Sequence, residues 1–336
     1  MNKLTKLGVT ALCGSLAAVA SANAGSMTVK GGATATWSSN EATVTGNPIG
    51  MNSGLTFTGS GELDNGTTFT LTLTNADQSA YSAGQIALTM PTLGTLTIDQ
   101  SGGGLDRIDD MMPTAWEETT GTSLGTGIVN VAGVSGSPSL DLGLSADMLP
   151  DGLSVNLAWS PRANGGGLTN DKAVGGAGNS IYGTGWDIVL QHSGLVDGLN
   201  VFGGLSQVEQ AADAASGDKS EKTIGATYAT GGLTFGYQWS NSNSNRTASA
   251  ATATYQNTLY GVSFAVNDDL SLSYGSQKSE RVKVNHVSTV EASVDSIQIA
   301  YSMGGASIKL AETDADNINY GTADRGATTL ALTLAF

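Results

Sequence analysis

The final nine residues, "TTLALTLAF" (Thr328 to Phe336), place an apolar side chain at every second position up to the last one. Leu330, Leu332, Leu334 and Phe336 share one face of an extended chain, because successive side chains of a strand point to opposite faces. The other face carries only threonine and alanine. The stretch therefore predicts a half-apolar β-strand, although chain termini normally fray. Such a strand needs a pairing partner.

The same period of two recurs along the whole chain. Further examples are "TTFTLTLT" (67–74), "LSVNLAWS" (153–160), "LTFGYQWS" (233–240) and "LSLSYG" (270–275). The polar face carries Thr, Ser, Gly, Asn and Gln rather than Lys, Glu and Arg, which is typical of a barrel whose apolar face meets lipid and whose lumen is wet. Alternation alone also fits a soluble extracellular sandwich or a stacked β-solenoid adhesin.

The links between these segments alternate between short and long. The short ones contain turn residues and lie at 63–66, 91–94, 149–152, 193–198, 230–232, 267–269 and 304–305. The long ones lie near 38–52, 75–83, 100–138, 160–182, 208–221, 241–252, 278–289 and 313–325. Seven short and eight long links predict sixteen strands with both termini on the short-turn side. This is the pattern of an all-β transmembrane antiparallel β-barrel with short periplasmic turns and long extracellular loops.

The aromatic residues support two interfacial belts. Four tryptophans fall at strand ends beside long links: Trp37, Trp159, Trp186 and Trp239. Four other aromatic residues fall at the opposite ends: Tyr228, Phe264, Tyr301 and Phe336. Aromatic girdles at both membrane surfaces are expected of a barrel in lipid.

The N-terminal segment 1–24 reads as a secretory signal peptide. Lys3 and Lys6 precede an apolar run, and Ala22-Asn23-Ala24 is a cleavage site of the A-x-A type. The run is too short to span a bilayer in the mature protein. Removal leaves residues 25–336 as the barrel, without cysteine, because Cys13 lies in the signal. A small disulfide-stapled fold is thereby excluded.

Charge excludes nucleic acid as a partner. The 14 lysines and arginines, less Lys3 and Lys6, leave 12 against 29 acidic residues, a formal balance of −17. A chain this acidic lacks the basic surface that phosphate backbones require.

The sequence resembles the Gram-negative trimeric porins. "TGSGELDNGTTFTLTLT" (58–74) is similar to the family's second strand, first turn and third strand, and "PTLGTLTIDQ" (91–100) to the turn and strand before its third loop. The resemblance implies a homotrimer in the outer membrane of a Gram-negative bacterium, surrounded by outer-membrane lipid. It also implies that the barrel-assembly machinery reads the last strand through Phe336, and that the third loop, at about 100–138, is inserted into the barrel and narrows the channel.

The third loop holds the candidate site. Its section "GGLDRIDDMMPTAWEETT" (103–120) contains five acidic residues and one basic residue: Asp106, Arg107, Asp109, Asp110, Glu117 and Glu118. An acidic, solvated surface loop is the alternative. Strand parity places Lys30 and Lys309 on the inner wall, together with Asp141 and Asp187, which add negative charge. Because a ring of carboxylates concentrates cations, we expect a pore constriction that prefers cations over anions.

The resulting hypothesis is a porin, a water-filled channel for passive diffusion of ions and small hydrophilic solutes. A substrate-selective outer-membrane channel and a secreted surface protein or adhesin remain as alternatives. An enzyme is not expected, because His192 and His286 are too few and too far apart for a metal cluster of ordinary spacing, and His192 is predicted at the periplasmic rim. A Ser-His-Asp arrangement is defined by geometry rather than sequence. No cofactor and no metal are implied, although the acidic third loop offers the oxygen ligands that calcium takes.

Overall fold

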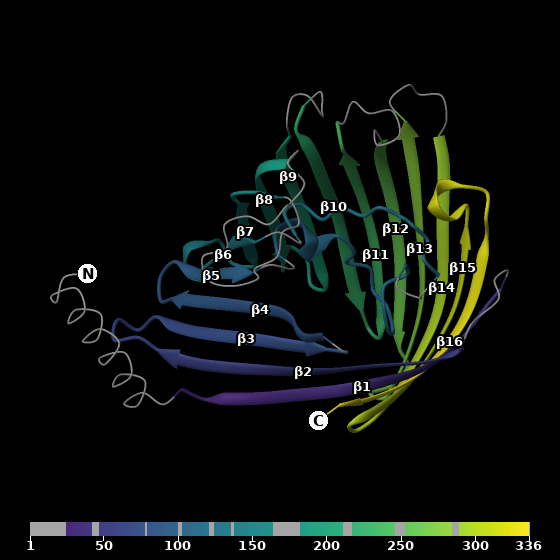
Figure 1. Ribbon diagram of the computed structural model, residues 1–336, viewed down its shortest axis with the longest axis horizontal. Helices are drawn as coiled ribbons and strands as arrows, with labels where there is room; N and C mark the ends of the chain where they lie inside the picture. Colours follow the sequence, from purple (N-terminus) through teal and green to yellow (C-terminus); the bar gives the residue numbers. More distant parts are fainter. Residues whose placement is uncertain are drawn as a thin grey trace, which may run out of the picture.

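The computed structural model is a closed barrel of sixteen antiparallel strands, each paired with its neighbour in the chain (Figure 1). It describes residues 25–41, 47–77, 79–99, 103–120, 124–135, 138–163, 182–210, 217–245, 253–283 and 289–335. The predicted signal peptide, His286 and Phe336 lie outside these residues. Among the described residues, no helix has the length and apolar character needed to cross a bilayer.

The strands are β1 (Met27–Asn40), β2 (Ile49–Glu62), β3 (Thr68–Ala76), β4 (Ser79–Met90), β5 (Gly94–Asp99), β6 (Ser139–Leu144), β7 (Leu153–Ser160), β8 (Tyr182–Ser193), β9 (Leu199–Gln210), β10 (Lys219–Thr230), β11 (Leu233–Asn243), β12 (Ala253–Ala265), β13 (Leu270–Lys283), β14 (Thr289–Met303), β15 (Ala306–Asp316) and β16 (Arg325–Ala335).

The pairing of the first and last strands closes the wall. The pairs run from Gly32 with Ala335 to Asn40 with Ala327, and Figure 1 shows β1 beside β16. This closure explains why an apolar strand stands at the end of the chain, since it leaves no unpaired backbone groups at an edge in lipid.

The two faces of the wall follow the predicted alternation. Leu330, Leu332 and Leu334 are exposed on the outside of β16. Side chains of the other parity meet inside, where Thr34 and Thr333 lie 3.0 Å apart between their Oγ1 atoms. Large apolar side chains therefore cover the outer surface, and the buried clusters form inside the barrel, where the third loop meets the wall.

Several predicted links are shorter than expected, because strand pairing continues beyond the apolar part of each strand. The link predicted at 75–83 comprises only residues 77 and 78, and the link predicted at 278–289 only residues 284–288. Small and polar residues hide the strand period there, yet their backbones still pair. Conversely, the turn predicted at 149–152 begins at Ser145, whose side chain accepts a hydrogen bond from the backbone of Asp147 and caps the short 3-10 helix η2 (Ala146–Met148).

Candidate functional site: the third loop inside the barrel

The third loop leaves the wall after β5 and crosses the inner surface of the barrel before the chain returns in β6 (Figure 1). It starts with the short 3-10 helix η1 (Gly104–Ile108). Leu105, Ile108 and Met112 are buried against inward-facing side chains of the wall, which are Val189, Phe202 and Leu259. Burial of each large apolar side chain contributes about 1.5 to 3 kcal/mol, so this cluster fastens the loop to β8, β9 and β12.

Glycines on the inner wall let the loop lie close to the strands. A Cβ atom at Gly236 of β11 would stand 2.5 Å from Cδ of Pro113, and one at Gly261 of β12 would stand 2.8 Å from the same atom. Real Cβ contacts are longer than this. The wall is therefore hollowed where Pro113 passes.

Two wall carboxylates hold the first turn of the loop. Asp141 of β6 accepts the backbone N–H of Gly104 at 2.9 Å and binds the Arg107 guanidinium at 3.1 Å. Asp187 of β8 accepts the backbone N–H of Leu105 at 2.9 Å and that of Val134 at 3.0 Å. Both carboxylates face inward as predicted, but the loop covers them, so they anchor it instead of adding charge to an open lumen.

Backbone conformation makes this anchoring possible. Gly104 and Gly133 have φ values of 53° and 60°, in the left-handed region that glycine tolerates best. A Cβ atom at either position would collide with the Asp187 carboxylate. Glycine is required there for the N–H groups to approach the wall.

Side-chain amides of two wall glutamines bind the backbone of the next part of the loop, which has no neighbouring strand to pair with. The Gln238 side chain donates to the carbonyl oxygens of Ile108 and Asp109 at 2.8 and 2.7 Å, and it accepts the N–H of Met111 at 3.0 Å. Gln298 accepts the N–H of Glu117 at 3.1 Å and donates to its carbonyl at 2.8 Å. Buried backbone groups that lack sheet partners are thereby satisfied.

The returning part of the loop is held by side chains of β10 and β16 and of the 3-10 helix before β16. Glu221 of β10 accepts the N–H of Gly133 at 2.7 Å and is ion-paired with Lys219 at 3.0 Å. The guanidinium of Arg325 in β16 donates to the carbonyl of Leu124 at 3.0 Å. The Tyr320 hydroxyl, in the 3-10 helix η3 (Ile318–Tyr320), accepts the N–H of Val129 at 3.1 Å.

The five acidic residues of the predicted site are gathered by this path. In each case burial raises the carboxyl pKa most, and neighbouring carboxylates raise it further; the group comprises Asp106, Asp109, Asp110, Glu117 and Glu118. The charge of Glu118 acts on Asp109, Asp110 and Glu117. We call these five residues the loop carboxyl cluster.

Two members of the cluster are shifted into the neutral pH range. Burial, followed by the charges of Glu118 and Asp106, raises the pKa of Asp109 to about 7. Burial raises the pKa of Asp110 to about 6, although its carboxylate accepts the N–H of Met112 at 2.9 Å, which lowers it. The cluster therefore changes its charge between about pH 5 and 8.

The predicted basic residues have different surroundings. Arg107 is paired with Asp141, so its charge is largely cancelled. Lys309 lies beside the loop, with Nζ 5.8 Å from the centre of the Trp116 ring, and its charge lowers the pKa of Glu117. Lys30 is exposed on the inward face of β1, and none of the described contacts joins it to the loop.

Sequence reasoning missed the residues that hold the loop. These are Gln238, Gln298, Glu221 and Arg325. Two further inward basic residues were also missed: Lys219 is paired with Glu221, and Arg281 donates to the carbonyl of Tyr320. The sequence did contain a signal for Gln238 and Gln298, because their side chains are longer than the Ser, Thr and Gly that occupy most other positions of the inward face. What each amide would bind could not be read from its own strand.

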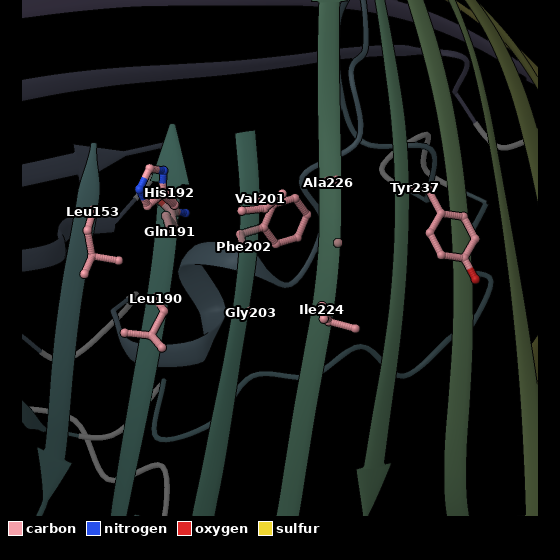
Figure 2. Close-up of a pocket in the computed structure, with 11 residues that line it drawn as sticks. Leu153, Leu190, Gln191, His192, Val201, Phe202, Gly203, Ile224, Ala226 and Tyr237 are labelled. Atoms are coloured by element: carbon pink, nitrogen blue, oxygen red, sulfur yellow. The ribbon is translucent and has the colours of Figure 1, made fainter. Parts of the chain in front are cut away.

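The described residues offer no metal centre. No group of three His, Cys, Asp or Glu side chains among them is arranged to hold a metal ion. His192 lies at one end of an apolar hollow on the outer surface of the barrel, beside Leu153 and Val201 (Figure 2). It is on the opposite side of the wall from the loop carboxyl cluster.

Comparison with solved structures shows the same fold. Salmonella typhi OmpF in complex with daunomycin is 13% identical, with a TM-score of 0.68 over 92% of this chain and 97% of that one. A loop-deletion mutant of the Vibrio cholerae outer-membrane protein OmpT is 11% identical, with a TM-score of 0.67 over 93% and 100%. An anion-selective porin from Comamonas acidovorans is 14% identical, with a TM-score of 0.62 over 93% and 100%.

Sequence comparison identifies the family. None of the curated proteins matches the chain significantly. Residues 8–306, however, match the profile of the family described as Gram-negative porin. This match covers most of the chain. Together with the closed sixteen-stranded barrel, it shows that the protein belongs to the Gram-negative porins, channels of the bacterial outer membrane.

Proposed function

We propose that this porin conducts ions and small hydrophilic solutes by passive diffusion and that it prefers cations to anions. The loop carboxyl cluster carries the proposal, because five acidic side chains meet inside the barrel while the one basic residue among them, Arg107, is paired with Asp141. The mechanism has no catalytic step and no energy coupling.

The constriction proposed here lies where the third loop narrows the lumen. Its residues are Asp106, Arg107, Asp109, Asp110, Glu117 and Glu118 on the loop, with Lys30 and Lys309 on the wall. Charges in a narrow lumen with low-dielectric walls act strongly on passing ions. The charge of Lys309 partly offsets the rise in the pKa of Glu117 that burial causes. For Asp109, the neighbouring charges that shift the pKa are all carboxylates.

The porin from Comamonas acidovorans is described as anion-selective. At 14% identity the two chains share a fold, and selectivity depends on the charges that each lumen carries. Family membership supports the further proposal of a homotrimer, with the barrel-assembly machinery recognising Phe336.

Reversal potentials in planar bilayers test the proposal. Purified protein should insert in discrete conductance steps, and under a KCl gradient at pH 8 the reversal potential should have the sign of a cation-preferring pore. Conductance steps with a reversal potential of the opposite sign would support a channel but overturn the cation preference. Absence of steps from folded protein would overturn the channel itself.

Cation preference should depend on pH. Because the pKa values of Asp109 and Asp110 are raised to about 7 and about 6, both carboxyls are charged at pH 8.5 and mostly neutral at pH 5. One unit charge a few ångströms from the ion path is worth about 1 kcal/mol in water-like surroundings, less with salt screening, so the permeability ratio should fall about two- to fivefold. Reversal potentials measured from pH 8.5 to 5 check this, and a flat profile would contradict it.

A further inference from the structure

The last long link of the barrel, residues 317–324 between β15 and β16, reaches the third loop. The backbone N–H of Asn319 donates to the carbonyl oxygen of Thr126 at 2.7 Å. One residue further, the Tyr320 hydroxyl accepts the N–H of Val129 at 3.1 Å. Two links that lie far apart in the sequence are thereby joined inside the barrel. We call residues 317–324 the clasp.

Apolar packing holds the clasp and the third loop together against the wall. Ile318, which is 4% exposed, lies in a buried cluster with Leu124 of the third loop and with side chains of β14 to β16, and Ile128 packs against this cluster. Tyr320 is buried as well, and its hydroxyl lies 2.7 Å from Oγ of Ser279 in β13. The clasp therefore has one defined position, which depends on the third loop being in place.

The backbone of the clasp is strained in this position. Asn317, Asn319 and Tyr320 have φ values of 53°, 54° and 55°. Side chains seldom adopt this left-handed region, although asparagine tolerates it better than most residues. Of the five such non-glycine residues in the described part of the chain, three lie here, so the strain is concentrated in the clasp. Strain of this kind persists only where surrounding contacts impose it.

Part of the third loop depends on the clasp for its position. Val129 and Asn130 are bound a second time by the wall, through the side-chain amides of Asn257 and Gln277 at 3.0 and 2.7 Å. Residues 125–128 have no such second attachment. Of the hydrogen bonds recorded among the described residues, only that from Asn319 to Thr126 joins this stretch to the wall or to another link.

We propose that the clasp is a latch on the third loop and that Asn319 and Tyr320 are positioning residues for the constriction. In the latched state the loop contacts hold three residues in left-handed conformation. In a released state these residues return to ordinary φ values, and residues 125–128 change their place in the lumen. Because strain on one side opposes two hydrogen bonds and the burial of Ile318 on the other, a single channel should switch between a main and a minor conductance level. This inference rests on the proposed function as a channel.

Two exchanges at Asn319 separate backbone strain from side-chain contact. The measurement is the fraction of time that single channels in planar bilayers spend at the minor level. Asn319→Gly and Asn319→Ala both remove the side chain that lies against Gly127. Glycine adopts φ near 54° without strain, whereas alanine tolerates it less than asparagine, so the fraction should fall about threefold in the first variant and rise about threefold in the second. A role through contacts alone would shift both in the same direction.

Tyr320→Phe tests the hydroxyl of the clasp. The exchange keeps the buried ring and removes the acceptor of the Val129 N–H, so the fraction at the minor level should rise about fivefold. Asn245→Gly and Asn245→Ala are the matched controls, because Asn245 also has a left-handed backbone, with φ of 48°, and its side chain donates to the carbonyl of Asp218 in another long link. Both should switch as the wild type does.

The outcomes distinguish the latch from the channel. A single conductance level in the wild type, Asn319→Ala and Tyr320→Phe would overturn the latch and leave the channel. Equal shifts in Asn319→Gly and Asn319→Ala, or in the Asn245 pair, would also overturn it. Absence of conductance from every folded variant would overturn the channel and the latch with it. Switching as expected, with a reversal potential of the anion-preferring sign, would support the latch and overturn only the cation preference.

Discussion

Gln238→Leu is expected to increase single-channel conductance and to weaken ion selectivity. The glutamine is fully buried and satisfies the backbone of the third loop at Ile108, Asp109 and Met111. Leucine keeps the size but leaves three backbone groups without these partners, one of them buried and two half-buried, at up to about 1 to 3 kcal/mol each. Most of this cost acts against the docked loop, because the barrel loses only the bond from Gln238 to the Thr223 hydroxyl and its strands keep their own pairing.

The measurement is conductance in planar bilayers, together with the reversal potential under a KCl gradient. Larger and noisier steps are expected, because the segment that carries Asp109 detaches from β11. Gln256→Leu is the matched control, since Gln256 is exposed on the outside of the neighbouring strand β12. Unchanged conductance in a correctly folded Gln238→Leu protein would show that this segment does not set the width of the pore.

Asp109→Asn combined with Asp110→Asn is expected to remove most of the pH dependence and to lower cation preference at pH 8.5. The exchange is nearly isosteric, and the asparagine oxygens can still accept the N–H groups of Asp110 and Met112. Up to two negative charges disappear from the proposed constriction, so the permeability ratio at pH 8.5 should fall about two- to fivefold or more.

A control pair makes this result specific. Asp268→Asn with Asp269→Asn changes the net charge of the chain by the same amount, but in the exposed turn between β12 and β13. It should leave both the permeability ratio and its pH profile as in the wild type. If the two double variants behave alike, the selectivity filter lies outside the Asp109 and Asp110 segment.

The alternating period was sufficient to predict the wall. Leu330, Leu332 and Leu334 share one face because a strand has a period of two, and the small polar residues of the other face predicted that the leucines turn outward. The same reasoning predicted the inward direction of Asp141, Asp187 and Lys309. Strand ends were less certain, as at residues 75–83, because backbone pairing continues where side chains have no apolar period.

The roles of the inward residues could not be predicted in this way. Asp141 and Asp187 were expected to add charge to the lumen, yet they are covered because the third loop brings the N–H groups of Gly104 and Leu105 to them. Likewise, Gln238 meets Met111 across a separation of 127 residues, and nothing in "FGYQWS" (235–240) indicates that partner. Residues this far apart in the sequence come into contact only when the barrel has closed around the third loop.

The sequence by itself determined the architecture of this protein: sixteen strands, an outward apolar face, a closing pair between the first and last strands, and an acidic third loop. Each of these depends on local side-chain period, turn residues or composition. Only the tertiary structure decided which inward carboxyls are covered as anchors of the third loop and which acidic residues gather in the loop carboxyl cluster. Those properties depend on burial and on distances between strands, and neither quantity exists until the barrel closes.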